Sequence, residues 1–220
     1  MSTAARPEVC LRARALSAAR GDRRVLDGID LEARMGEAVA IHGPNGAGKS
    51  TLLEILALLR PIAGGELRWF GQAAGVDDLA TRRRMTLVMQ PALLLNRSVL
   101  DNVRYGLRAR GRSAADAGVQ AQRALDRVGL TALADRSAKR LSAGERQRVN
   151  LARALALPVE VLLLDEPDAN LDEASTRKLA AILEEIREAG RHLIVIASPT
   201  ESLVLPRPDT VLELPAASAG

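Results

Sequence analysis

The sequence predicts an α/β protein in which a mainly parallel β-sheet carries an N-terminal antiparallel β layer and an inserted α-helical subdomain. Two apolar runs, residues 37–42 and 161–164, have the continuous hydrophobic character of strands buried on both faces of a parallel sheet. A glycine-rich loop and a helical pattern follow the first run, and a helical pattern also follows the second. With 220 residues the chain can bury one substantial core, so we expect a single domain over residues 1–220.

The antiparallel layer is predicted by the first thirty or so residues. Short apolar stretches at 25–26 and 29–31 are broken by Gly21-Asp22 and by Asp27-Gly28, which are typical of tight turns. Aromatic side chains make up only 1% of the chain, so its core has to be built from Leu, Ile, Val and Ala.

The strongest motif follows the first buried run and reads Gly43-Pro44-Asn45-Gly46-Ala47-Gly48-Lys49-Ser50-Thr51. It fits G-x-x-x-x-G-K-[ST] in full, between a predicted strand and a helical run at 50–59. Glycines let backbone N–H groups turn toward a phosphate, and the start of the helix adds the positive end of its dipole. Lys49 is expected to reach the β- and γ-phosphates of ATP, and the Ser50 hydroxyl to bind Mg²⁺. We therefore expect a P-loop NTPase core that binds ATP through residues 43–51.

The middle of the chain changes from strand to helix patterns. After a short strand at 87–90, Ala, Arg and Leu recur at helical spacing, which predicts the helical subdomain at about 91–140. Ser142 begins a helix that Pro158 ends.

The remaining segments complete the predicted organisation. A helix at about 173–189 precedes a last buried strand at 192–197. We expect the RecA-like core with its β layer at about 10–90 and 141–205. A Pro- and Ala-rich tail at 206–220 is expected to be only partly ordered.

Two adjacent carboxylates follow the second buried run. The strand at 161–164 delivers Asp165 to its C-terminal end, where α/β sheets place ligands. Asp165 is expected to hold Mg²⁺, directly or through water. Glu166 is the natural general base for an attacking water, because it stands next to the metal-binding carboxylate. Alone, two acids before a turn could be helix caps, but beside the phosphate loop the catalytic interpretation is favoured.

With these motifs in this order, residues 10–205 resemble the ATP-binding cassette (ABC) family of transporter ATPases. Leu141-Ser142-Ala143-Gly144-Glu145 resembles the family signature, with Ala143 where a second glycine is usual. The resemblance implies that Ser142, Gly144 and Glu145 contact the ATP bound to another subunit. It also implies that Gln90 is the glutamine that links Mg²⁺ and water to the transporter interface. Asp172, in the stretch Ala169-Asn170-Leu171-Asp172, is implied to cross the dimer interface.

One departure from the family concerns the histidine that follows the last core strand and contacts the γ-phosphate. Pro199 stands in that place, and proline offers neither a side-chain donor nor a backbone N–H. Ser198 or Thr200 could make a weaker neutral contact. His192 begins the strand about 20 Å from its phosphate end. We expect His42 to be packed or hydrogen-bonded in the core rather than catalytic. We therefore expect slow or partner-dependent hydrolysis.

A second departure concerns the adenine. The family stacks adenine on an aromatic side chain near position 20, where this chain has Arg20. A guanidinium can stack on the base, and an exposed, uninvolved Arg20 is an equal alternative.

The composition excludes several other classes of protein. The net charge is only +4, the longest basic run is Arg82-Arg83-Arg84, and aromatic platforms are scarce, so nucleic acid is not expected as a partner and that run is expected to be a solvated surface. The single cysteine, Cys10, excludes an internal disulfide and suits a reducing compartment. The apolar runs fall short of the roughly 20 residues that span a bilayer. We expect a cytoplasmic protein, peripheral on the inner face of the cell membrane.

The resemblance implies an ATP-hydrolysing subunit that powers translocation through a separate transmembrane permease. It also implies a second ATPase subunit, identical or paralogous, and a substrate-binding protein in the case of an importer. Residues 90–111 resemble the tungstate/molybdate importers, which suggests oxyanion import. The alternatives are another importer or an exporter, a hydrolysis-impaired subunit beside an active paralogue, and a soluble ABC protein without a transport role.

Overall fold

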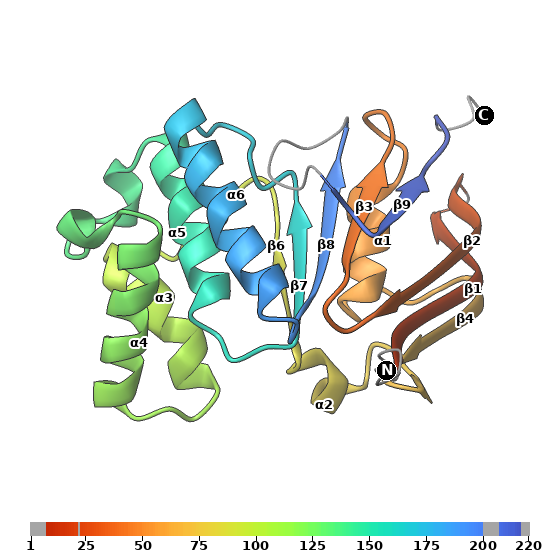
Figure 1. Ribbon diagram of the computed structural model, residues 1–220, viewed down its shortest axis with the longest axis horizontal. Coiled ribbons are helices and arrows are strands. Elements are labelled where there is room, and N and C mark those ends of the chain that lie inside the picture. The colour runs from red at the N-terminus through yellow and green to blue at the C-terminus, as the bar shows by residue number, and fades with distance from the viewer. Residues whose placement is uncertain (1–7, 22, 200–206, 217–220) are drawn as a thin grey trace, which may run out of the picture.

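The structure is a computed structural model that describes residues 8–21, 23–199 and 207–216. It contains two β-sheets and a group of helices (Figure 1). An antiparallel sheet lies at one end of the molecule, helices α3 and α4 lie at the other, and a parallel sheet stands between them.

The antiparallel sheet has the strand order β2-β1-β4-β5. Its strands are β1 (Val9–Arg20), β2 (Arg23–Arg34), β4 (Gly64–Trp69) and β5 (Gln72–Ala73). The predicted turn at Gly21 is present, with a left-handed φ of 62°. The predicted turn at Asp27-Gly28 is wrong: both residues lie inside β2, and the register against β1 shifts between the Leu16↔Ile29 and Ala18↔Leu26 pairs. Gly28 takes a φ of 63° there, because a bulge can use the same left-handed conformation as a turn.

The parallel sheet has the strand order β6-β7-β8-β3-β9, and all of its pairs are parallel. Its strands are β6 (Met85–Val88), β7 (Val161–Asp165), β8 (Leu193–Ser198), β3 (Ala38–His42) and β9 (Thr210–Glu213). The sequence assigned no strand to the tail at 206–220, whereas β9 pairs with β3 from Val39 to His42. After β9, Leu214 is buried against the core. The tail therefore forms the edge of the sheet.

The helices begin where the sequence offers caps. They are α1 (Lys49–Leu56), α2 (Leu79–Arg82), α3 (Val99–Ala109), α4 (Ala114–Arg127), α5 (Ala143–Leu155) and α6 (Glu173–Glu188), with 3₁₀ turns at Thr131–Leu133 and Ala138–Arg140. A side-chain oxygen accepts a hydrogen bond from the backbone N–H three residues on, which satisfies a free donor of the first turn. The residues that do so in the longer helices are Ser98, Ser113, Ser142 and Asp172.

The parallel sheet separates two hydrophobic clusters. Successive side chains along a strand point to opposite faces, so β6, β7, β8 and β3 contribute to both clusters, whereas β9 contributes to one. On one face the sheet packs against α3 to α6 through Leu162, Leu164, Ile194 and Ile196. On the other it packs against α1 and the antiparallel sheet through Val161, Leu163, Val195 and Ala197. Helix α1 is thus buried between the two sheets, which fixes the position of its N-terminus.

The basic run at 82–84 was expected to be a solvated surface, and its last residue departs from this. Arg84 forms two hydrogen bonds with Glu160, of 2.7 and 2.6 Å. Its guanidinium also lies 3.2 Å from the centre of the Phe70 ring. Arg84 therefore joins β6 to the start of β7. Among the described residues, no helix has the length and apolar character to cross a membrane.

Candidate functional site

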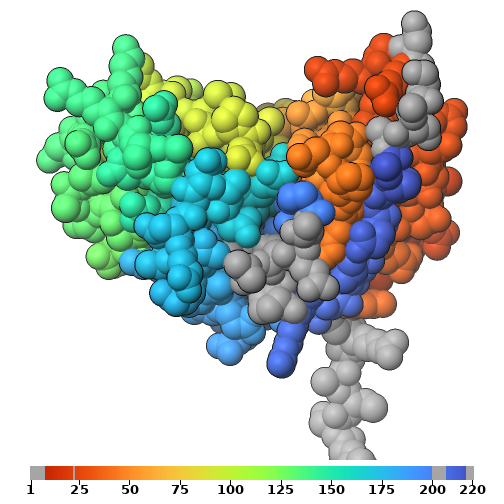
Figure 2. All heavy atoms as spheres, turned by 90° about the horizontal axis from the view of Figure 1, so that it is seen from above, coloured from red at the N-terminus to blue at the C-terminus, as the bar shows by residue number. Residues whose placement is uncertain are grey.

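The carboxyl ends of the parallel strands bring the predicted site residues to one edge of the sheet. The P-loop follows β3, Asp165 ends β7, and Gln90 lies two residues beyond β6. Figure 2 looks onto this edge, where the surface is hollowed between the helical part in green and the P-loop in orange. Ligands of α/β proteins bind at such an edge.

The P-loop has the backbone that only glycine tolerates. Gly46 and Gly48 have φ values of 85° and 96°, in the left-handed region. A Cβ on Gly43 would lie 2.7 Å from the carbonyl oxygen of Leu214, and one on Gly48 would lie 2.8 Å from Leu26 Cδ2. Gly48 is also the N-cap of α1 and has no side chain to cap it. The first N–H groups of this helix therefore face the loop, where an anion can accept from them.

Lys49 is held inside the loop that precedes it. The residue is 6% exposed, and its Nζ donates to the carbonyl oxygens of Gly43 at 2.7 Å and Pro44 at 3.1 Å. A buried ammonium in this position favours an anionic ligand, because a phosphate would compensate its desolvated charge.

Asp165 and Ser50 meet at the base of the site. Asp165 is 6% exposed, and burial raises its pKa, while a hydrogen bond with Ser50 and the charge of Lys49 act in the opposite direction. A carboxylate and a hydroxyl side by side suit Mg²⁺, which prefers oxygen ligands and keeps several waters. A cation there would also favour the ionised form of the buried carboxylate. The residues present thus fit the metal expected from the sequence.

Glu166 has a strained backbone. Its φ is 43°, in the left-handed region, where a non-glycine residue is uncommon. The N–H of Glu166 donates to Ala197 at 2.9 Å, and its carbonyl accepts from Ala169 at 3.1 Å. These bonds fix the turn after β7 and place the Glu166 side chain on the wall of the site.

One cavity of about 520 Å³ gathers the phosphate-binding residues and Glu166. Its lining residues are Arg20, Arg23, Arg24, Val25, Asn45, Gly46, Gly48, Lys49, Ser50, Thr51 and Glu166. Arg20 therefore lies beside the P-loop, as its proposed contact with the base requires. Arg23 and Arg24 were not predicted, although three arginines within residues 20–24 were a signal that could have found them.

The signature residues lie on a different part of the surface. Ser142 Oγ accepts from the N–H of Glu145 at 3.2 Å, and the Glu145 carboxylate accepts from the N–H of Ser142 at 2.7 Å. The hydrogen bond from the Ser142 N–H lowers the pKa of the Glu145 carboxyl. Asp172 caps α6 by accepting from the N–H of Ser175 at 2.7 Å, which lowers the pKa of Asp172. None of these residues is among those that line the P-loop cavity, and neither is Gln90.

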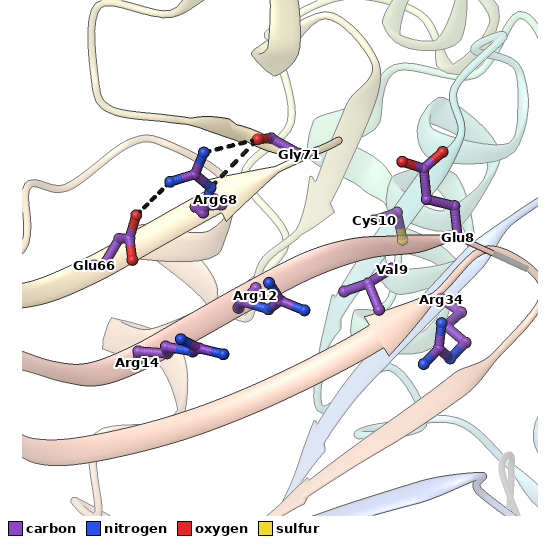
Figure 3. Close-up of a pocket in the computed structure, with 9 residues that line it drawn as sticks. All are labelled: Glu8, Val9, Cys10, Arg12, Arg14, Arg34, Glu66, Arg68 and Gly71. Carbon is purple, nitrogen blue, oxygen red and sulfur yellow. Dashed lines mark hydrogen bonds and ion pairs between the residues drawn. The ribbon is translucent and has the colours of Figure 1, made fainter.

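A second depression must be separated from the P-loop cavity. It measures about 490 Å³ and lies on the antiparallel sheet, among side chains of β1, β2 and β4 (Figure 3). Two of its arginines are already paired with carboxylates, Arg12 with Glu32 at 2.6 Å and Arg68 with Glu66 at 2.6 Å. Among the described residues that line it there is no helix N-terminus, so we assign the phosphate chemistry to the P-loop cavity.

Comparison with known proteins identifies the family. A family model described as ABC transporter matches residues 26–169, which is more than half of the chain. The chain belongs to the ABC transporter family. It contains the ATPase domain of that family, as its motifs predicted.

Several ABC proteins show how far the similarity extends. The cytochrome c biogenesis ATP-binding export protein CcmA of Paramagnetospirillum magneticum is 39% identical, over 83% of this chain and 85% of CcmA. The cobalt import ATP-binding protein CbiO of Rhodobacter capsulatus is 42% identical, over 79% of this chain and 64% of CbiO. The match spans about half the length of several other curated relatives.

A solved ABC structure has the same fold. It is described as a dimeric post-hydrolysis state of the ATP-binding cassette MJ0796 bound to ADP and Pi. The TM-score is 0.85 at 26% identity, over 93% of this chain and 94% of that one.

The position at which the resemblance implies a histidine lies directly after β8. Pro199 directly follows β8 and is exposed, Ser198 ends that strand and is 5% exposed, and Thr200 lies outside the described residues. His42 is adjacent to Ser198 in the sheet, but its Nδ1 lies 3.3 Å from the Glu213 carboxylate. This confirms a hydrogen-bonded His42. His192 precedes β8, at the opposite end of the strand from Ser198.

Proposed function

We propose that this chain is the ATP-binding and ATP-hydrolysing subunit of an ABC transporter, which powers translocation through a separate membrane permease. One observation carries the proposal. The P-loop at the start of α1 and the general-base candidate at the end of β7 line the same cavity of about 520 Å³. That volume suits a nucleotide-sized ligand.

The residues of the cavity have different roles in the proposed phosphoryl transfer. The N–H groups of the loop and Lys49 bind the phosphates and orient the γ-phosphate for in-line attack. Ser50, Asp165 and Gln90 are the residues that would hold Mg²⁺, which neutralises phosphate charge when bound. Glu166 accepts the proton of the attacking water, and its fixed turn keeps the carboxylate in place.

The contacts to the base are proposed from the arginines of the β1–β2 hairpin. Arg20 lines the cavity beside the P-loop, and its planar guanidinium can stack on adenine in place of an aromatic ring. Arg24 forms an exposed ion pair of 2.8 Å with Asp27 at the same rim.

A second ATPase subunit, identical or paralogous, completes the site in this proposal. Ser142 and Gly144 stand at the N-terminus of α5, which is proposed as a second anion-binding element outside the P-loop cavity. With Glu145 and Asp172 they would contact the nucleotide and the interface of the facing subunit. The dimeric state described for MJ0796 supports this arrangement.

The permease is proposed to dock beside Gln90. A groove of about 310 Å³ runs along β6 and the end of α1, and Leu59, Leu87 and Met89 contribute apolar side chains to its lining. Leu93 and Tyr105 are 73% and 49% exposed in the helical part that follows Gln90. Exposed apolar side chains of this kind are candidates for contact with a partner. Docking there would hold the chain at the cytoplasmic face of the cell membrane.

The transported substrate is proposed by analogy alone. Residues 90–111 favour import of an oxyanion of the tungstate or molybdate type, with a substrate-binding protein as a further partner. Relatives are described as importers of sulfate, phosphate, iron and cobalt, and CcmA is described as an exporter. Uptake of labelled molybdate by cells with and without the gene tests this point.

A second candidate function is a nucleotide-binding subunit with impaired hydrolysis beside an active paralogue. Pro199 favours it, because no side-chain donor stands at the position where the family has a histidine.

Steady-state ATP hydrolysis with Mg²⁺ separates the two functions, with Glu166→Gln and Pro199→His measured beside the wild type. Turnover by the wild type and its loss in Glu166→Gln would support the hydrolytic subunit. ATP binding with almost no turnover, restored by Pro199→His, would support the impaired one.

A further inference from the structure

Three side chains of α5 donate hydrogen bonds to the main chain of the segments that carry the catalytic candidates. Gln147 Nε2 donates to the carbonyl oxygen of Pro167 at 3.2 Å. Asn150 Nδ2 donates to that of Met89 at 2.9 Å. Because Pro167 directly follows Glu166 and Met89 directly precedes Gln90, each bond lies one peptide from a candidate group.

A third donor continues the same strip of the helix. Arg153 Nη1 donates to the carbonyl oxygen of Leu93 at 2.6 Å, beyond Gln90. Gln147, Asn150 and Arg153 are spaced three residues apart, which places them along one side of a helix over roughly 9 Å. The segment that carries Gln90 is therefore held to α5 on both sides.

Two of the three donor residues are buried. Gln147 is 3% exposed and Asn150 is 8% exposed, and burial lowers the pKa of the Arg153 guanidinium. The bond from Gln147 to Pro167 is buried, so removing its donor leaves a carbonyl that bulk water does not reach. The bond from Asn150 to Met89 is partly buried, and its loss frees the segment before Gln90 from α5.

The same helix begins at the signature residues. Gly144 approaches the main chain of Asn170 so closely that an added Cβ would lie 2.8 Å from its carbonyl oxygen. A helix of 13 residues is a stiff rod of about 20 Å, so a displacement at one end moves all of its contacts together.

We propose that Gln147, Asn150 and Arg153 are positioning residues that fix Glu166 and Gln90 relative to the signature end of α5. They act through the main chain of Pro167, Met89 and Leu93 and touch no substrate. The inference rests on the proposed hydrolytic function, in which Glu166 and Gln90 take part.

The alternative is that these side chains only satisfy main-chain carbonyls and have no effect on the catalytic candidates. Asn102 offers a matched control, because it is fully buried and bonds the main chain of Leu95 and Ser98 at 2.7–3.0 Å. Asn102→Ala removes two bonds to main-chain carbonyls and one from the Leu95 N–H, on the same connecting segment and farther from Gln90 in the sequence.

The test measures kcat, KM for ATP and thermal unfolding of Asn150→Ala and Asn102→Ala. We expect Asn150→Ala to lower kcat about tenfold with KM for ATP nearly unchanged, because misplaced groups cost rate more than binding. Asn102→Ala should lower the unfolding temperature at least as much and leave kcat within about twofold, since it displaces no candidate group. Equal kcat losses in the two variants would overturn the proposal.

A double-mutant cycle with Gln90→Ala distinguishes a positioning role of Asn150 from a purely structural one. If Asn150 acts through Gln90, Asn150→Ala has no further effect on kcat in the Gln90→Ala background. If the double variant instead loses kcat by the product of the two single losses, the two residues act independently and the inference is contradicted. Asn150→Ser, whose hydroxyl is too short to reach the Met89 carbonyl, replaces Asn150→Ala if that variant does not fold.

Failure of this inference can be told from failure of the proposed function. A dead Glu166→Gln variant beside an Asn150→Ala variant with wild-type kcat overturns the inference alone. A wild type without ATP turnover overturns the hydrolytic function and this inference together.

Discussion

Gly144→Ala should destabilise the nucleotide-free protein, although alanine is the better helix former. Gly144 lies in the first turn of α5, and a Cβ there would lie 2.8 Å from the carbonyl oxygen of Asn170. That atom belongs to the backbone, so it cannot move aside as the end of a long side chain would.

Two magnitudes decide the sign of this effect. Replacing a helical glycine with alanine gains up to about 1 kcal/mol from backbone entropy. Overpacking against a fixed group costs about 1–3 kcal/mol, and the carbonyl would have to retreat by roughly 0.6 Å to reach ordinary contact. The cost exceeds the gain, so we expect a net loss of about 1 kcal/mol.

Gly118→Ala is the matched control for this prediction. Gly118 lies inside α4, and an added Cβ would meet no atom within 4 Å. This variant should gain about 0.5–1 kcal/mol, because only the propensity term applies. Urea unfolding followed by circular dichroism measures both variants beside the wild type. If Gly144→Ala proves as stable as Gly118→Ala, the contact with Asn170 does not constrain the signature helix, and the reasoning fails.

Further predictions concern three other positions. Burial lowers the pKa of His192 below its usual 6.5. The unfolded chain therefore binds a proton at this histidine more readily than the folded one, and the free energy of unfolding should fall as pH falls below 6.5. His192→Gln should remove this loss when unfolding is measured across pH. Arg20→Ala should weaken binding of a fluorescent ATP analogue several-fold, and Arg20→Tyr should restore it if the guanidinium stacks on the base; unchanged affinity in Arg20→Ala would refute the contact. Arg84→Lys should lower the free energy of unfolding in urea by about 1 kcal/mol, because it loses the two hydrogen bonds to half-exposed Glu160 and the stacking on Phe70. An unchanged free energy would show that neither contact stabilises the fold.

The parts of the site that the sequence predicted are those whose conformation is set within a few residues. The P-loop is one, because Gly46 and Gly48 need left-handed backbone and α1 follows at once. The start of α5 is another, since Ser142 and Glu145 satisfy each other's backbone donors within one turn. Local chemistry of this kind can be recognised without knowing the rest of the fold.

The parts that the sequence did not predict depend on partners far along the chain. The strand β9 has four residues in a Pro- and Ala-rich tail, and it exists because β3 lies open beside it. Arg84 looked like part of a solvated run, whereas Glu160, which orders it, lies 76 residues away. Single-sequence periodicity contains no information about such pairs, so it assigns both segments to the surface.

The geometry of Glu166 bears on whether ATP hydrolysis is possible with Pro199 after β8. A left-handed backbone at a glutamate costs of order 1 kcal/mol and persists only where its surroundings enforce it. Here two hydrogen bonds, to Ala197 and from Ala169, enforce it and hold the side chain on the wall of the P-loop cavity. Pro199 takes part in neither of these bonds, so the turn that holds Glu166 does not depend on it. We therefore expect slower hydrolysis rather than none, and in this hypothesis a partner that supplies a donor for the γ-phosphate would act on a site that is already in place.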